Sequence, residues 1–243
     1  MQKALAALCC LLALACGCAG IHGTERARTI RAQMAREGQQ PDSVRGVGSF
    51  RLERDGGTVS GRLAFAAQSP ERFRAELLAP FGQPVASLAS DGKHLYYYSR
   101  SDREFTEAAP RALVLKRALG ILISPEALVS LLCGRAPIID ASRVALEEKA
   151  GEEGPILTLS DAWGAVRERL WLLPDLSAAY RAEVFSPYGN KEYEVWLTRR
   201  ENAPAAILLK GPDQTSLRIV PDRLMENQEI PAETFVLQRP AEP

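Results

Sequence analysis

The sequence is poor in the residues that build catalytic and metal centres. It holds two histidines, His22 and His94, and four of its five cysteines lie among the first eighteen residues. Zinc sites need several such side chains close together, so we expect no metal site. A nucleophilic Cys133 would need a histidine partner. Its neighbours Leu131 and Leu132 favour instead a small buried apolar residue.

Signatures of nucleotide and nucleic-acid binding are also missing. The chain has no Gly-x-Gly-x-x-Gly and no Gly-Lys-Ser/Thr loop. Its 30 basic residues balance its 30 acidic ones, so no basic excess favours nucleic acid. Acidic pairs such as Glu147-Glu148 and Glu152-Glu153 flank a glycine turn and are typical of solvated charge. We therefore expect a chain that is not an enzyme and that needs no cofactor.

The N-terminus has the order of an export signal. Lys3 precedes an apolar run over residues 4–15, and small residues lead into cysteine. The run is too short to span a bilayer, which needs about 20 apolar residues. Ala-Cys at 15–16 and Gly-Cys at 17–18 are similar to bacterial lipoprotein cleavage sites, at which the cysteine is acylated. We predict a signal peptide over residues 1–17 with cleavage before Cys16 or Cys18; an ordinary signal or a buried apolar helix is the alternative.

The rest of the chain predicts a mainly β fold. Residues 18–43 read as a stem and a helix over 24–37. Apolar alternation with a period of two then predicts strands from residue 44 onward, with Asp55-Gly56-Gly57 as a hairpin turn. Strand patterns resume at Ile156 and run to a last edge segment at 231–237. We predict about eleven or twelve antiparallel strands, with one face wet and one apolar, in a domain over residues 44–243.

Two helical patterns interrupt the strands. Residues 110–119 and 124–132 carry leucines at helical spacing, and Ser124-Pro125 forms a good helix start. Gly134 is placed to end the second helix. Two short amphipathic helices in a chain of strands predict a lid over the apolar face of the sheet.

Three segments carry a family resemblance: Val44–Leu52, Ser60–Phe65 and Pro70–Gly82, together with the helical stretch Ile123–Gly134. They resemble the LolB family of outer-membrane lipoprotein receptors over roughly 40% of the chain. The resemblance implies an incomplete antiparallel β-barrel of about eleven strands. A helical lid would enclose an apolar cavity that accepts lipoprotein acyl chains. The remaining chain matches other lipid-binding lipoproteins of the LolA/LolB superfamily equally well.

The resemblance also implies a membrane-insertion loop. In the family, a loop between two early strands has a Pro-Leu-Gly-like tip with a protruding apolar residue. Pro80-Phe81-Gly82 occupies the matching place. Phe81 is then expected at the loop apex, where it would touch the membrane. The alternative is a phenylalanine folded back onto the edge of the sheet.

The apolar face supplies the candidate cavity. An apolar period fits a packed core and a ligand cavity equally well, so the sequence leaves both open. The side chains that would line the cavity are Phe50, Leu52, Leu63, Phe65, Phe73, Leu77, Leu128 and Leu131.

These inferences converge on a lipid-anchored protein on the periplasmic side of the outer membrane. We expect a monomer that receives acylated lipoproteins from a periplasmic carrier and helps to insert them into the membrane, without nucleic-acid partners. The residue after the acylated cysteine is Gly17 or Ala19 rather than aspartate, which favours the outer membrane. The alternatives are a carrier of another amphiphile, such as a glycolipid, and a structural envelope lipoprotein that binds a protein partner.

Overall fold

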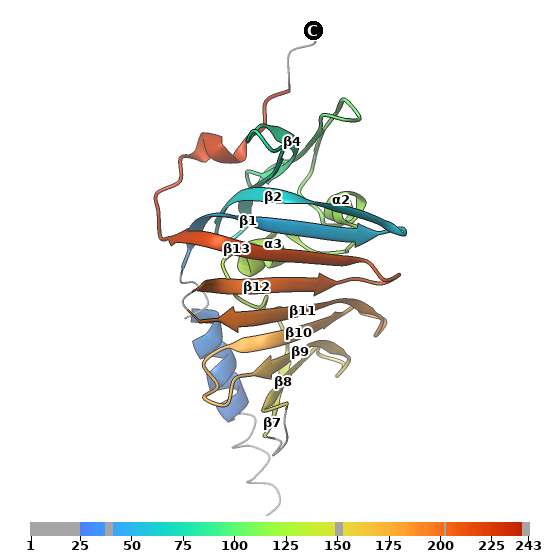
Figure 1. Cartoon of the computed structure of the whole chain (residues 1–243). Helices are drawn as coiled ribbons and strands as arrows, with labels where there is room; N and C mark the ends of the chain where they lie inside the picture. Colours follow the sequence, from blue (N-terminus) through green and yellow to red (C-terminus); the bar gives the residue numbers. More distant parts are fainter. Residues whose placement is uncertain (1–24, 37–40, 149–152, 202, 240–243) are drawn as a thin grey trace, which may run out of the picture.

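The protein is built on one antiparallel sheet of thirteen strands, here described from a computed structural model (Figure 1). The structure describes residues 25–36, 41–148, 153–201 and 203–239. The predicted signal peptide, Cys16 and Cys18 lie outside these residues. The predicted mainly β fold is confirmed.

The strands follow the predicted alternation closely. Their bounds are β1 Ser43–Arg54, β2 Gly57–Gln68, β3 Arg72–Leu78, β4 Pro84–Ser90, β5 Leu95–Ser99, β6 Glu104–Ala108, β7 Arg143–Glu147, β8 Ile156–Ser160, β9 Val166–Leu172, β10 Ala179–Phe185, β11 Lys191–Arg200, β12 Ala203–Lys210 and β13 Ser216–Glu226. The helices are residues 25–36, α2 Ala112–Leu119, α3 Pro125–Leu132 and the 3₁₀ turn η1 Ala232–Phe235.

The sheet consists of two meanders, β1–β6 and β7–β13, which are joined where the last strand pairs with the first. Its order is β6-β5-β4-β3-β2-β1-β13-β12-β11-β10-β9-β8-β7. The last strand therefore pairs with the first, for example at Phe50 opposite Ile219 and Leu52 opposite Leu217. β6 and β7, which are the two ends of this order, are joined through α2 and α3, and this leaves an incomplete barrel.

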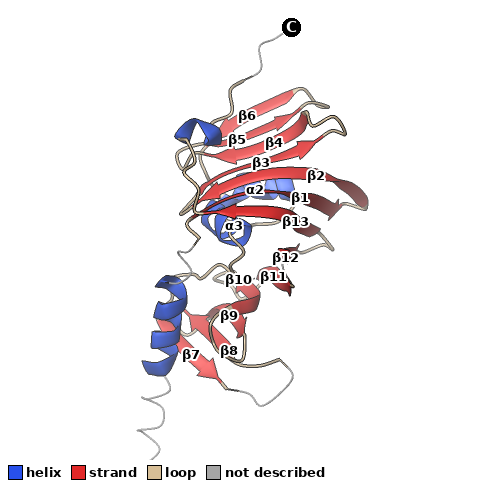
Figure 2. Ribbon diagram, turned by 60° about the vertical axis from the view of Figure 1, so that its left-hand side comes forward, coloured by secondary structure: helices blue, strands red, loops and turns tan. Residues whose placement is uncertain are grey.

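The helices cover the concave face of the sheet. α2 and α3 lie against its first half, and the helix over residues 25–36 lies beside its second half (Figure 2). Both helices predicted between the strands are confirmed. α3 begins at the predicted place, because Ser124 accepts a hydrogen bond from the Ala127 amide at 3.2 Å and Pro125 occupies the first turn.

One continuous apolar core joins the sheet to these helices. Phe73, Leu115, Ile121, Leu157 and Leu170 are each fully buried in it. Burial of such side chains stabilises the fold by about 1.5–3 kcal/mol each. The concave face is therefore filled over most of its area by side chains from the helices.

The C-terminal segment differs from the prediction. Residues 231–237 were expected to form an edge strand, but they cross the convex face of the sheet as η1 and an extended stretch. Phe235 is fully buried against Ala66, and Leu237 packs with Ala89 and Tyr96. Burial of these two apolar side chains on the convex face takes the place of pairing at the sheet edge.

The other half of the convex face is covered by its own side chains. The guanidinium of Arg181 lies 4.0 Å from the ring centre of Trp171 and 4.5 Å from that of Trp196. It also pairs with Glu183 and Glu194 at 3.0 and 3.1 Å. This cation–π and ion-pair cluster shields the backbone of β9–β11 without a covering segment.

Candidate functional site

The candidate site is a pocket of about 610 Å³ at one end of the sheet, between the concave face and its helical cover. Its volume lies within the range of about 300–1,000 Å³ that is usual for small-ligand sites. The start of β10, the end of β11, the start of β12 and the end of β13 form its floor. The apolar side chains around it are Met34, Ala35, Pro41, Cys133, Ala136, Ile138, Ala178, Ala179, Leu197, Ala203, Pro204, Ala205 and Leu224.

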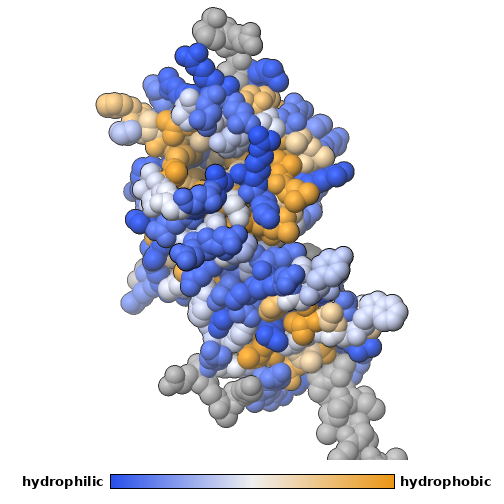
Figure 3. Space-filling view, turned by 90° about the vertical axis from the view of Figure 1, so that its right-hand side faces the viewer, coloured by the Kyte–Doolittle hydropathy of each residue, from blue (hydrophilic) through white to orange (hydrophobic). Residues whose placement is uncertain are grey.

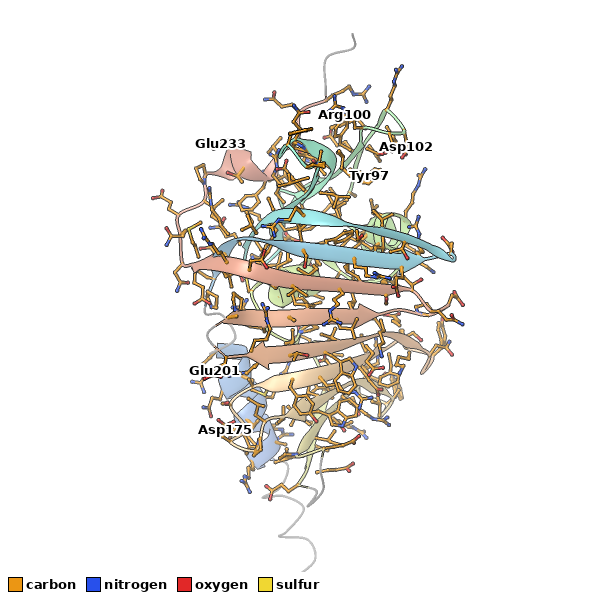
Figure 4. The ribbon with its side chains drawn as sticks, viewed as in Figure 1. Tyr97, Arg100, Asp102, Asp175, Glu201 and Glu233 are labelled. Atoms are coloured by element: carbon orange, nitrogen blue, oxygen red, sulfur yellow. The ribbon has the colours of Figure 1, made fainter. Side chains whose placement is uncertain are left out.

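Arginines give the pocket a cationic rim. The lining residues include three arginines, Arg135, Arg199 and Arg200, and one carboxylate, Glu226. Figure 4 labels Asp175 and Glu201 at this end of the strands, beside the helix over residues 25–36. The pocket thus combines apolar and polar side chains, and two of its three arginines interact with further carboxylates, Arg135 with Asp42 and Arg199 with Asp175. Such a mixed lining fits an amphiphile with a polar head.

Two of these arginines are held in place by neutral oxygens. Arg135 donates to the Pro41 carbonyl at 2.6 Å and to the Ser69 hydroxyl at 3.2 Å. Arg200 donates to the Pro204 and Pro221 carbonyls at 2.9 and 2.5 Å. Burial lowers the pKa of Arg135 from its ordinary value. Because carbonyl and hydroxyl groups carry no charge, these bonds orient the guanidinium groups and leave their positive charge in place.

Cys133 lies in the wall of the same pocket. The predicted buried position is confirmed, since the residue is 4% exposed. Burial raises the pKa of its thiol to about 11, so the thiol stays protonated at neutral pH. A protonated thiol is a poor nucleophile, and Cys133 serves here as a small wall residue.

The predicted cavity residues lie on the concave face, but beside this pocket rather than around it. Leu63, Phe65, Phe73, Leu128 and Leu131 are buried in the main core. Phe50 and Leu52 pack against that core, and Leu77 is half-buried next to Gly61. Contact of these eight side chains with an acyl chain stays a prediction.

A second groove, of about 620 Å³, lies on the convex face beside η1. Val47, Ala64, Ala66 and Met225 contribute its apolar surface, and Phe65 also reaches it. Arginines and Glu76 border it. This groove is a competing place for an apolar ligand, and experiments on the pocket need to separate the two.

The predicted insertion loop lies at the opposite end of the strands from the pocket. Phe81 stands at the apex of the turn between β3 and β4 and is 95% exposed. Gly82 follows with a φ of 81°, and its amide donates to the Ala79 carbonyl at 2.8 Å. The structure thus places Phe81 in solvent, and not folded back onto the sheet.

Sequence reasoning missed a buried carboxyl group on the concave face. Glu168 of β9 is 0% exposed, and one of its oxygens accepts the Ile139 amide at 2.9 Å. Its other oxygen makes no hydrogen bond within the described residues. Burial raises the pKa of Glu168 to about 8, although this hydrogen bond and the nearby Arg31 both act to lower it. The signal was present: Glu168 is in phase with the inward-facing Leu170 and Leu172.

Glu168 fixes the cover of the second half of the sheet. Arg31, on the helix over residues 25–36, donates to the Ile139 carbonyl and to Asp140, both at 3.1 Å. Ile139 is therefore bonded to Glu168 below it and to Arg31 above it. These contacts join the N-terminal helix, the segment after α3 and the sheet.

The described residues contain no group of three or more His, Cys, Asp or Glu side chains placed to hold a metal ion. Within the same residues, no helix is long and apolar enough to cross a membrane.

Comparison with known proteins places the fold. No family model matches the sequence, and no curated protein matches it. Among solved structures, a LolA superfamily protein from Nitrosomonas europaea aligns with a TM-score of 0.58 at 13% identity, covering 87% of this chain and 97% of the other. This chain therefore has the same type of fold as that LolA superfamily protein.

Two further structures agree with this assignment. A DUF1329 family protein from Desulfovibrio piger aligns with a TM-score of 0.60 at 11% identity, covering 88% of this chain and 97% of the other. A proposed outer membrane lipoprotein-sorting protein domain from Vibrio parahaemolyticus gives 0.60 at 9% identity, covering 87% and 97%. The LolA-type fold is thus shown, while the finer resemblance to the LolB family stays a prediction.

Proposed function

We propose that this protein is an envelope lipoprotein that binds acyl chains of lipoproteins on its concave face and helps to insert them into the outer membrane. The observation that carries the proposal is the pocket between the concave face and the helices, which is lined by apolar side chains together with three arginines. Binding comes from burial of methylene groups, at up to about 0.8 kcal/mol for each. No covalent step is involved.

The LolA-type fold supports this proposal. One of the similar structures is described as a proposed outer membrane lipoprotein-sorting protein domain, and all three aligned structures cover 87% or more of this chain. A lipid anchor at Cys16 or Cys18 would hold the protein at the bilayer, with a periplasmic carrier as the donor of lipoproteins. A single acyl chain anchors only marginally, so the multiple acylation typical of bacterial lipoproteins matters physically.

A blocked-pocket experiment tests the binding site. Ala205 lines the pocket and Ala64 lines the convex groove. Binding of a fluorescent long-chain fatty acid to the full chain is measured for Ala205→Phe and for the matched Ala64→Phe variant. We expect Ala205→Phe to weaken binding at least tenfold and Ala64→Phe to leave it unchanged. The reverse pattern would place the ligand in the convex groove and overturn the proposal.

The identity of the ligand is tested in cells. Lipids bound to the full chain are extracted and identified by mass spectrometry, and the protein is depleted. Acylated lipoproteins in the extract, together with their accumulation in the periplasm after depletion, support the proposal. A bound glycolipid would identify a carrier of another amphiphile. Absence of any lipid would favour a structural envelope protein.

Phe81 provides a separate test of delivery. Phe81→Glu places a charge at the loop apex, far from the pocket. We expect acyl-chain binding to persist and transfer of lipoproteins to membranes to fall. Unchanged transfer by this variant would rule out the predicted insertion role of Phe81.

A further inference from the structure

Three turns at one end of the sheet share one construction. They are Ala79–Gln83 between β3 and β4, Asp161–Ala165 between β8 and β9, and Ser186–Asn190 between β10 and β11. In each, the amide of the fourth residue donates to the carbonyl of the first, at 2.8, 3.1 and 3.0 Å respectively. The amide of the first residue donates to the carbonyl of the fifth, at 2.8, 3.0 and 2.8 Å.

The same positions in these turns hold the same kinds of residue. The fourth residue is Gly82, Gly164 or Gly189, with φ of 81°, 91° and 80°, values that glycine adopts without strain. The third residue is aromatic in every turn. Phe81, Trp163 and Tyr188 are 95%, 93% and 90% exposed. The chain thus presents an aromatic ring three times by one local geometry.

The antiparallel meander places all three turns at the same end of the strands. This is the right-hand end in Figure 1, where the turns β1–β2 and β10–β11 are visible. Figure 3 views this end face on and shows apolar side chains gathered on it among charged ones. At the opposite end, no large apolar side chain of the described strand connections is exposed in this way.

We infer that Trp163 and Tyr188 form a second membrane-contact site, built like the turn of Phe81. This inference extends the membrane contact of the proposed function to the other half of the sheet. Strand spacing of about 4.8 Å puts the turns of Trp163 and Tyr188 roughly 10 Å apart, and Phe81 roughly 30 Å from Tyr188 along the curved sheet. Contacts on both halves would fix the orientation of the protein on the bilayer.

The occupant is a lipid surface rather than a protein. The aromatic turns are separated by polar ones, with Asp55-Gly56 and Asp213-Gln214 lying between Phe81 and Tyr188 in the strand order. A protein interface needs a contiguous buried centre, whereas a bilayer accepts separate anchor points. Tryptophan and tyrosine suit the headgroup level, because their rings are apolar with one polar edge. Arg143, beside Gly164, can meet lipid phosphates there.

Side-chain hydrogen bonds fix the backbone of the two turns that carry these rings. The Asp161 carboxylate accepts the amides of Trp163 and Ala165 at 2.9 and 3.0 Å. The Ser186 hydroxyl accepts those of Tyr188 and Asn190 at 3.3 and 3.2 Å. Because the backbone of the turns is already ordered in this way, insertion of the rings requires little further ordering of the main chain.

Fluorescence of Trp163 tests the inference directly. The full chain is reconstituted with phosphatidylethanolamine and phosphatidylglycerol vesicles that contain brominated acyl chains. Trp171 is buried and Trp196 lies in the Arg181 cluster, so Trp163→Phe removes the reporter and defines the background. We expect bromolipids to quench the wild type well beyond the Trp163→Phe variant. Equal quenching of the two proteins would overturn the inference.

A matched pair of variants tests whether Tyr188 takes part. Tyr188→Ser is expected to weaken the contact about tenfold, the scale of withdrawing one large side chain from lipid, and to reduce Trp163 quenching. Met225→Ser removes an exposed apolar side chain on the convex face and should leave quenching intact. Any N-terminal tether is the same in all variants. If both variants lose Trp163 quenching equally, or if neither loses it, the role of Tyr188 in the membrane contact is overturned.

The two proposals fail separately. Fatty-acid binding is measured on the same Tyr188→Ser protein and is expected to be unchanged, because the pocket lies at the other end of the strands. If neither the wild type nor Ala205→Phe binds the fatty acid, the result would count against the acyl-binding function alone. Absence of Trp163 quenching would count against the membrane contact alone.

Discussion

Replacing Glu168 by glutamine should change how stability depends on pH. The variant keeps a side-chain oxygen that can accept the Ile139 amide, which lies 2.9 Å from the carboxylate in the wild type. It removes the ionisation. Because burial raises the pKa of Glu168 to about 8 from an ordinary value of 4.5, the folded state binds a proton in this range that the unfolded state has lost.

The sign and size follow from proton linkage. A carboxyl group whose pKa is raised in the folded state adds to the free energy of unfolding, and this contribution is fully present below pH 4.5, the ordinary pKa. This contribution is lost as the pH rises through 8. The slope approaches about 1.4 kcal/mol per pH unit. Between pH 5 and 8 the wild type should therefore lose up to about 4 kcal/mol from this group.

Urea unfolding followed by circular dichroism between pH 5 and 8 measures the effect. The free energy of unfolding of the wild type should fall relative to that of Glu168→Gln as the pH rises. Other titrating groups are common to both proteins and cancel in the difference. Parallel pH profiles for the two proteins would refute the reasoning, because they would show that Glu168 titrates alike in the folded and unfolded states.

Two further predictions concern the fold. A Cβ on Gly48 would lie 2.4 Å from the Val220 carbonyl oxygen, so Gly48→Ala should cost about 1–3 kcal/mol in urea unfolding. The same change at Gly57, which has no such close contact, should cost less than about 0.5 kcal/mol; equal costs would contradict the clash. Ser124→Ala removes the cap that accepts the Ala127 amide and should cost about 1 kcal/mol, whereas Ser124→Asp should retain stability. Equal losses in the two Ser124 variants would argue against capping.

Local sequence patterns predicted most of the sheet because alternation is a local property. The exception is β7, Arg143–Glu147, in which only Val144 and Leu146 face inward and charges stand at both ends. Such a short edge strand carries too few apolar positions to show a period. The C-terminal segment was misassigned for a related reason. Phe235 and Leu237 alternate as in a strand, and only the tertiary structure shows that they pack on the convex face.

Local sequence patterns could not predict the pocket. Its walls come from segments as far apart in sequence as Met34, Cys133, Leu197 and Leu224, and no period links them. The turns of Phe81, Trp163 and Tyr188 were within reach, since each reads as a small residue or proline, an aromatic residue and glycine. The family resemblance drew attention to the first alone. What the sequence could not show is that the three turns lie at one end of the sheet.

That common end is a consequence of the topology. In an antiparallel meander, connections alternate between the two ends of the strands, so β3–β4, β8–β9 and β10–β11 fall together, and the pocket at the starts of β10 and β12 falls opposite. Substitutions in the aromatic turns therefore change side chains that contact neither the pocket nor the core. For the same reason, a lipid bound in the pocket lies a full strand length from the aromatic rings. A path along the concave face to those rings would meet the packed core beneath α2 and α3, so delivery at the aromatic end by this path would need these helices to move away from the sheet.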